Sequence, residues 1–194
     1  MQQVLVNLSN HHIHLTTEDV RILFGEDATL TKKVDLLQSG QFAANETVTI
    51  KGPKGEITNI RVVGPTRSQT QCEILTGDTY KLGYAVSEVP VRLSGDLAGS
   101  AAFTIIGSHG SLHKPEGLII AQRHIHIDPD TAKTMNLSDA QAVTLQLNTL
   151  NKRTDLHDVT VRAQPGAILE CHIDVEEGNA SGIQNGYLAK ILNT

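Results

Sequence analysis

The sequence predicts a mainly β protein that contains an internal duplication. Three observations predict it: short alternating apolar stretches typical of strands, a His-Ile-His motif that occurs twice, and a strand-like Cys-(Glu/His)-Ile motif that also occurs twice. Long helical patterns are few. Many short strands with few helices favour two small β-barrels or a barrel-like sandwich.

The composition is that of an ordinary globular chain, with 194 residues, 39% hydrophobic residues and a net charge of −5. No basic patch with interleaved aromatic residues is present, which argues against a nucleic-acid partner. Two cysteines do not make a disulfide scaffold. No apolar run reaches membrane-spanning length, and the N-terminus lacks a signal-peptide pattern. We expect a cytoplasmic protein without membrane association.

In the first half, an apolar-alternating strand over residues 4–9 runs directly into the first His-Ile-His. Thr16 or Thr17 caps a two-turn helix that Gly25 ends. A hairpin follows over residues 46–64, with its turn at 52–55. The segment 29–45 has no counterpart in the second half.

The second half repeats this order. A strand over residues 118–121 runs into the second His-Ile-His, and Asp128 caps a helix with Pro129 in its first position and Asn136 at its end. A hairpin is expected over residues 142–163, around a polar loop near Asn151–Asp155. The halves align again where 71–83 matches 170–182, which places Cys72 on Cys171 and Glu73 on His172.

The repeated His-Ile-His motif predicts metal binding. Side chains at i and i+2 of a strand share a face, so His12 converges with His14, and His124 with His126. Pairs of half-exposed strand histidines are the alternative interpretation. Glu73 and His172 supply a third ligand to each pair, and three ligands with an open position are typical of catalytic zinc. His11 has the parity of Ile13 and is not counted as a ligand.

Other reactive side chains have simpler interpretations. Cys72 and Cys171 neighbour proposed ligands, so they point to the opposite strand face, as small buried residues. Histidines in polar loops are expected at the surface: His109, His113 and His157. Arg67 follows the Gly64-Pro65 turn on the way to Glu73, where it could bind phosphate, although a solvated arginine is the alternative.

The ordered motifs of the chain resemble those of the PduL-type phosphotransacylases, the phosphate propanoyltransferase family. The matching blocks cover nearly the whole chain and are Ser9–Leu15, Gly40–Ala44, Gly64–Ile74, Ser94–Leu97, Ala121–His126 and His172–Ala180. The resemblance implies two β-barrels with short capping helices and a di-zinc site between them. It also implies that the first strand joins the C-terminal barrel, which gives one barrel over 11–121 and a second from 1–10 plus 122–194.

The resemblance also implies site roles. His12, His14 and Glu73 would hold the zinc that binds the coenzyme A sulfur, and His124, His126 and His172 would hold the second zinc. Arg67 would face phosphate. Four residues match positions on the coenzyme A side: Ser9, Arg61, His172 and Asn179. The implied reaction converts a short-chain acyl-CoA (propanoyl or acetyl) and phosphate into acyl-phosphate and CoA.

Two departures from the family pattern stand out. His11 occupies a position that is usually arginine, whereas the second copy keeps Arg123. The N-terminal extension of many members from bacterial microcompartments, as in propanediol degradation, is not seen. Encapsulation and homo-oligomerisation stay open. The alternatives are a zinc-dependent thioester or phosphoester hydrolase, which the ligands alone would permit, and a non-catalytic protein with structural zinc.

Overall fold

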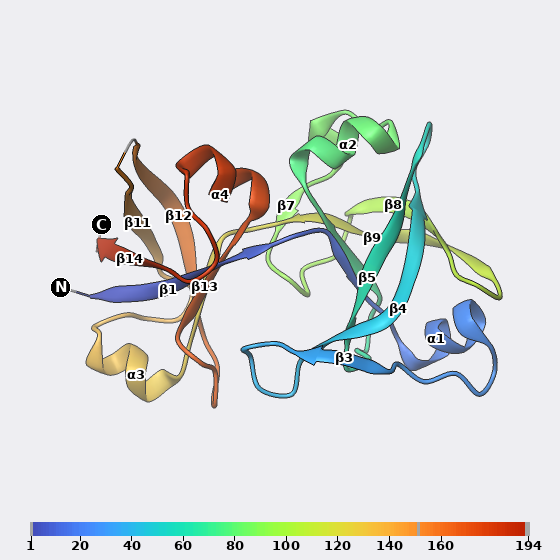
Figure 1. The fold of residues 1–194 in the computed structure, drawn as a ribbon, viewed down its shortest axis with the longest axis horizontal. Helices are drawn as coiled ribbons and strands as arrows, with labels where there is room; N and C mark the ends of the chain where they lie inside the picture. Colours follow the sequence, from blue (N-terminus) through green and yellow to red (C-terminus); the bar gives the residue numbers. More distant parts are fainter. Residues whose placement is uncertain (1, 151, 193–194) are drawn as a thin grey trace. The chain divides into compact units, whose positions relative to one another are not determined.

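The computed structural model describes residues 2–150 and 152–192 and is mainly β, which confirms the predicted fold class (Figure 1). The chain forms two compact units. The terminal unit comprises Met1–Asn10 and Gln122–Thr194, and the central unit comprises His11–Ala121. Among the described residues, no helix has the length and apolarity needed to cross a bilayer.

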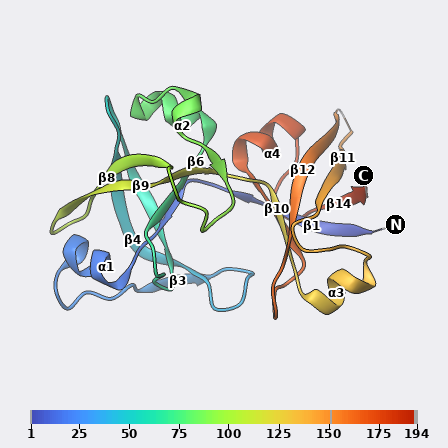
Figure 2. The same ribbon diagram turned by 180° about the vertical axis from the view of Figure 1, so that it is seen from behind.

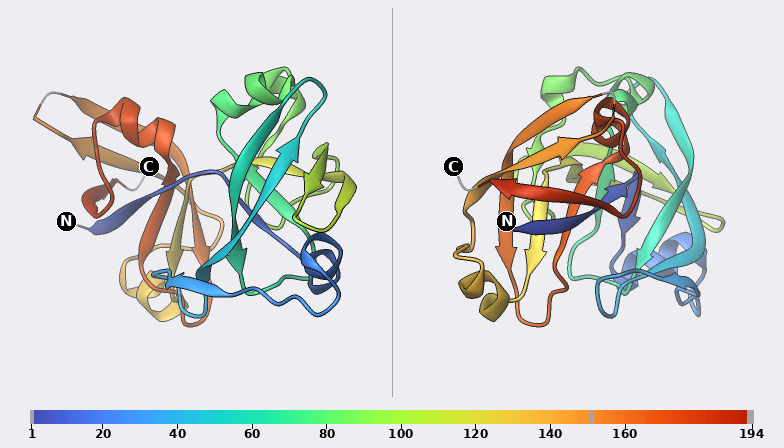
Figure 3. Two further views of the ribbon diagram at one scale, coloured as in Figure 1. Left: turned by 45° about the vertical axis from the view of Figure 1, so that its right-hand side comes forward. Right: turned by 60° about the vertical axis from the view of Figure 1, so that its left-hand side comes forward.

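The terminal unit is a closed barrel of six strands, in the order β1-β13-β10-β12-β11-β14. Red β14 lies beside blue β1 in the right-hand view of Figure 3, and their antiparallel pairing closes the barrel. The strands are β1 (Gln3–Ser9), β10 (His124–Ile127), β11 (Ala142–Asn148), β12 (Arg153–Ala163), β13 (Glu170–Asp174) and β14 (Tyr187–Leu192).

The central unit contains a second closed ring, β4-β5-β2-β6-β9-β8, because β8 pairs with both β9 and β4 (Figure 2). Two short strands attach to it from outside, β3 (Lys32–Asp35) on β4 and β7 (Val91–Arg92) on β9. The ring strands are β2 (His12–His14), β4 (Phe42–Lys51), β5 (Glu56–Gly64), β6 (Gln71–Ile74), β8 (Ala101–Ile106) and β9 (Ser111–Ala121).

The duplication extends to strand pairing. In the terminal unit β1 is parallel to β13 and β10 is parallel to β12. The central unit has the same two parallel pairs, β9 with β6 and β2 with β5. The strand before each His-Ile-His motif therefore pairs in one unit, and the motif itself pairs in the other. β1 precedes β2 but pairs in the terminal unit, and β9 precedes β10 but pairs in the central unit.

This exchange corrects one expectation. The sequence predicted one strand running into each His-Ile-His, but the strand breaks at residues 10–11 and 122–123 because the chain changes partners there. The two helices that follow the motif are as predicted. Thr16 caps α1 (Thr17–Phe24) before Gly25, and Asp128 caps α3 (Pro129–Thr134) with Pro129 in its first turn.

Two further helices were not predicted, α2 (Thr76–Leu82) and α4 (Val175–Ser181), with a short 3-10 helix η1 (Val86–Glu88) after α2. α2 and α4 directly follow β6 and β13 and end at glycines in the left-handed conformation, Gly83 and Gly182. Both predicted hairpins form, but β12 already begins at Arg153, so the second loop lies earlier than expected. Asn151, named in that loop, lies outside the described residues.

Each unit has its own aliphatic core. Ile13 and Cys72 belong to the core of the central unit, and Ile125 and Cys171 belong to that of the terminal unit. Because neighbouring side chains on a strand alternate in direction, burying these residues turns the histidines of both motifs to the other face. The cores therefore set the direction in which the candidate ligands point.

Candidate metal centres

The central unit gathers His12, His14 and Glu73 into one cluster. β2 and β6 are antiparallel, and their register places His12 directly opposite Glu73. The ligand atoms of the three side chains all lie within 4.8 Å of one another. The Nε2 of His12 is 3.6 Å from the Oε2 of Glu73. The three side chains come from two strands, and together they have the spacing of a metal site.

The terminal unit repeats the arrangement with His124, His126 and His172, whose ligand atoms also lie within 4.8 Å of one another. His124 lies directly opposite His172 across β10 and β13. The Nε2 atoms of His124 and His126 are 3.1 Å apart. Two nitrogen ligands of a tetrahedral zinc ion are separated by about 3.3 Å, from bonds of about 2.0 Å. The donor set therefore fits zinc.

Hydrogen bonds to backbone carbonyls orient two of the imidazoles. The Nδ1 of His14 donates to the Val63 carbonyl at 3.0 Å, and the Nδ1 of His124 donates to the Gln122 carbonyl at 2.8 Å. A carbonyl only accepts, so each ring carries a proton on Nδ1, and its Nε2 lies on the opposite side of the ring. Hydrogen bonds of this kind fix ring orientation around bound metals.

Two of the imidazoles are also held neutral. Burial, helped by the charges of His12 and Arg67, lowers the pKa of His14 to about 3. Burial, helped by His124, His172 and Arg162, lowers the pKa of His126 to about 3. Neutral imidazole is the form that binds metal, so neither ring has to lose a proton at neutral pH.

The cysteines lie on the opposite strand face, as the parity argument expected. Cys72 and Cys171 are fully buried in the two cores. Burial raises the pKa of both thiols, with the nearby carboxylates Glu73 and Glu177 adding to the effect. A protonated, enclosed thiol is a poor nucleophile and a poor ligand.

Arg67 lies in the loop between β5 and β6. Its backbone N–H donates to the Leu15 carbonyl at 2.9 Å, just beyond the His-Ile-His strand, and its Nη1 donates to Ser94 Oγ at 2.9 Å. Gln71 donates to the same Ser94 oxygen and to Glu73 Oε1, both at 2.6 Å. A short hydrogen-bonded chain therefore links Arg67 to a candidate metal ligand.

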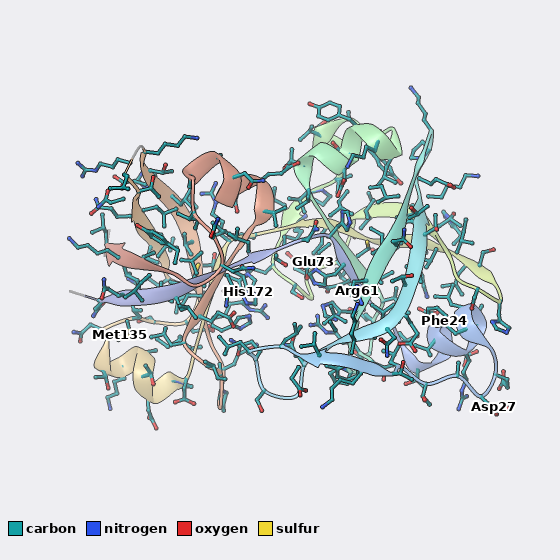
Figure 4. All side chains as sticks on the ribbon, viewed as in Figure 1. Phe24, Asp27, Arg61, Glu73, Met135 and His172 are labelled. Carbon is teal, nitrogen blue, oxygen red and sulfur yellow. The ribbon has the colours of Figure 1, made fainter. Side chains whose placement is uncertain are left out.

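The residues matched to coenzyme A are spread over both units. Ser9 pairs with Asp174, the N-cap of α4, and α4 carries the exposed Asn179. His172 belongs to the same unit, whereas Arg61 lies beside His12 in the central unit and donates to the Ala44 carbonyl at 2.8 Å. Figure 4 labels Arg61 and Glu73 on the central unit and His172 on the terminal unit. Their contacts with coenzyme A stay a prediction.

The three histidines expected at the surface, His109, His113 and His157, are exposed, but two of them are not in loops. His113 lies in β9 and His157 in β12. The stretches around His113 and His157 resemble loops in sequence because polar, exposed side chains predominate there.

Sequence reasoning missed three polar side chains beside the ligands. Gln71 and Glu170 each lie two residues before the third ligand, on the same strand face, and Arg162 lies next to His126 in the register of β10 and β12. The signal was present, since strand parity places residues i−2 and i together.

Comparison with known proteins agrees with this geometry. A family profile described as phosphate propanoyltransferase matches residues 5–184. The chain is 44% identical to the phosphate propanoyltransferase of Thermotoga maritima over 97% of this chain and 89% of that protein. It is 49% identical to the one of Priestia megaterium over 92% and 81% of the two chains, and 43% identical to the one of Rhodobacter capsulatus over 97% and 86%. The chain therefore belongs to the phosphate propanoyltransferase family and is an acyltransferase.

Proposed function

We propose that the chain is a zinc-dependent phosphate acyltransferase that interconverts short-chain acyl-CoA plus phosphate with acyl-phosphate plus CoA. The observation that carries the proposal is the pair of three-residue ligand sets, one in each unit. Three protein ligands leave a position open for a substrate atom, whereas structural zinc sites are closed by four. Propanoyl and acetyl are the acyl groups proposed.

Two zinc ions per chain are proposed, one held by His12, His14 and Glu73, and one held by His124, His126 and His172. A bound zinc ion supplies Lewis acidity and lowers the pKa of a thiol that coordinates it, which makes CoA a better leaving group. The chain's own contribution is to hold the rings of His14 and His124 in fixed orientations through the Val63 and Gln122 carbonyls.

Arg67 is proposed to bind phosphate. Its guanidinium can form two parallel hydrogen bonds with phosphate oxygens, and Ser94 limits the orientations available to it. Ser9, Arg61, His172 and Asn179 are proposed to line the coenzyme A side. Holding phosphate and thioester together lowers the entropic barrier, so phosphate oxygen attacks the acyl carbon directly and the C–S bond breaks to release CoA.

The test combines a zinc count per chain with an assay of CoA release from acetyl-, propanoyl- and butanoyl-CoA, with and without phosphate. The proposal expects two zinc ions, and acyl-phosphate together with CoA only when phosphate is present. Release of free carboxylate without phosphate would instead identify the zinc-dependent hydrolase. Full activity in chelator would overturn the zinc dependence.

A matched pair of variants ties the assay to the site. His14→Ala removes a buried candidate ligand and is expected to abolish binding of one zinc and most turnover. His113→Ala removes an exposed histidine of the same unit and should change neither. Light scattering gives the oligomeric state, and microcompartment association needs a separate co-purification measurement.

A further inference from the structure

Each ligand set occupies three corners of a four-residue patch on two antiparallel strands. In the central unit His12 faces Glu73 and His14 faces Gln71. Side chains directly opposite each other on such strands share a face and lie in contact range. Gln71 is therefore the fourth corner.

The terminal unit has the same patch. There His124 faces His172, and His126 faces Glu170, so Glu170 is the fourth corner. Gln71 and Glu170 are both buried, and each residue has 2% of its surface exposed to solvent. Deeply buried polar side chains at matching places in both units call for a physical role.

Each fourth corner contacts the third ligand of its patch. The Nε2 of Gln71 donates to Glu73 Oε1 at 2.6 Å. The Oε1 of Glu170 lies 3.0 Å from the Nε2 of His172, and Asn7 donates to the same carboxylate oxygen at 2.6 Å. Gln71 and Glu170 therefore each contact the candidate ligand that comes from their own strand, opposite the His-x-His strand.

The orientation of Gln71 is set from outside the patch. The backbone N–H of Gly95 donates to Gln71 Oε1 at 2.9 Å, which turns the amide NH₂ towards Glu73 and Ser94. Gln71 thus binds Oε1 of Glu73, while Oε2 faces the Nε2 of His12. A carboxylate held in this way presents one defined oxygen to a metal.

The charged corner differs between the patches. In the central unit the third ligand is Glu73 and the fourth corner is the neutral Gln71. In the terminal unit the third ligand is the neutral His172 and the fourth corner is Glu170. Each patch therefore contains one His-x-His pair, one carboxylate and one neutral partner. A buried carboxylate is stabilised by nearby positive charge. Arg67 and Arg162 act on the two patches, and a divalent cation in each patch would add to them.

We propose that Gln71 and Glu170 are the positioning residues of the two metal centres, and that each centre is built around a single carboxylate that has exchanged corners between the duplicated units. This inference rests on the proposed metal sites. Glu170 would orient His172 and supply the negative charge of its centre, and Gln71 would fix the metal-facing oxygen of Glu73.

The test measures zinc affinity of the full chain by competition with a fluorescent zinc indicator. Glu170→Gln keeps the side-chain size but removes the charge, and should weaken one zinc equivalent about 10- to 100-fold while leaving the other unchanged. Gln71→Met should weaken the other equivalent, so the double variant loses affinity at both. Asp155→Asn removes an exposed carboxylate of the terminal unit and should alter neither.

A corner-exchange variant tests the charge argument directly. Glu170→Gln combined with His172→Glu gives the terminal unit the residue pattern of the central unit. It should bind the affected zinc at least tenfold more tightly than Glu170→Gln alone. Equal or weaker binding by the combined variant would overturn the single-carboxylate rule.

The outcomes separate this inference from the proposed function. A wild-type chain that binds no zinc overturns the proposed function. If the wild-type chain binds two zinc ions and Glu170→Gln binds both as tightly as the wild type does, only the role of Glu170 is overturned. Cobalt substitution gives a second readout, because an altered ligand orientation changes the visible absorption band. If Glu170→Gln does not fold, Glu170→Asp is the substitute, because it retains the charge at shorter reach. It should weaken the same zinc equivalent by less than the about 10- to 100-fold expected for Glu170→Gln, and unchanged affinity would count against the proposal.

Discussion

The Nδ1 of His11 lies 2.9 Å from the Oδ2 of Asp78, and Arg123 forms the corresponding ion pair with Glu177 in the other unit. Each basic residue directly precedes a His-x-His strand. Each acid is the third residue of the helix that follows the third-ligand strand, and it also accepts from the backbone N–H at the helix start. His11 therefore makes with Asp78 the strand-to-helix contact that Arg123 makes with Glu177 in the other unit.

Removal of His11 should destabilise the central unit. Burial opposes ionisation of Asp78, but hydrogen bonds from His11, Lys81 and the Leu75 amide outweigh it and lower the pKa of the carboxyl to about 2. His11→Ala takes one partner from a buried acid and should lower the free energy of unfolding by about 1–3 kcal/mol. Urea unfolding in chelator measures this without a contribution from bound metal.

His11→Arg should retain most of that stability, because arginine makes the same pair in the terminal unit. Arg21→Ala is the matched control, since it removes an exposed ion pair with Glu18 and should cost less than about 1 kcal/mol. Equal losses for His11→Ala and Arg21→Ala would show that the Asp78 pair contributes nothing specific.

Arg67→Lys should weaken phosphate binding selectively. Lysine keeps the charge but cannot form two parallel hydrogen bonds or reach Ser94 in the same geometry. We expect the KM for phosphate to rise about tenfold or more, with the KM for acyl-CoA nearly unchanged. Arg92→Lys, at a half-exposed arginine that pairs with Asp96, should leave both constants unchanged. A rise confined to the KM for acyl-CoA would assign Arg67 to the other substrate.

Cys72→Ala should retain turnover. The thiol is fully buried and its raised pKa keeps it protonated, so a covalent acyl-enzyme on Cys72 is disfavoured. Initial-rate plots with both substrates varied should intersect, as direct transfer requires. The variant should lose about 1 kcal/mol of stability, as should Cys171→Ala in the other core. Parallel initial-rate plots and a dead Cys72→Ala enzyme that still binds zinc would establish the covalent route.

The sequence predicted the ligand clusters because strand parity alone brings i and i+2 together, and the second alignment supplied Glu73 and His172. It predicted the six-residue α3 from its start signals, Asp128 and Pro129, but not α2, whose N-cap Leu75 offers no side-chain cap. For α4 a signal was present, the capping box of Asp174 with Glu177. The partner exchange of β1 and β9 was also hidden from residue patterns, because apolar alternation specifies a buried face and not a neighbouring strand. Gln71 and Glu170 were missed because a polar residue in a strand more often faces solvent.

Acid should destabilise the metal-free protein through His14 and His126. Burial lowers the pKa of each from the ordinary value of 6.5 to about 3, so the unfolded chain binds more protons than the folded chain between these values. The free energy of unfolding should therefore be highest above pH 6.5 and fall as the pH drops towards 3. Urea unfolding in chelator at pH 7.5 and pH 5 measures the difference.

His14→Gln tests which group is responsible, because glutamine is polar but does not titrate. The loss of stability between pH 7.5 and pH 5 should shrink in this variant and stay unchanged in His113→Gln, whose side chain is exposed in both states. Carboxylates contribute little to this comparison, because their ordinary pKa values lie below the interval and they are common to all the variants. If His14→Gln retains the full pH dependence, the imidazole of His14 is not held neutral by burial, and its readiness to bind metal at neutral pH loses its physical basis.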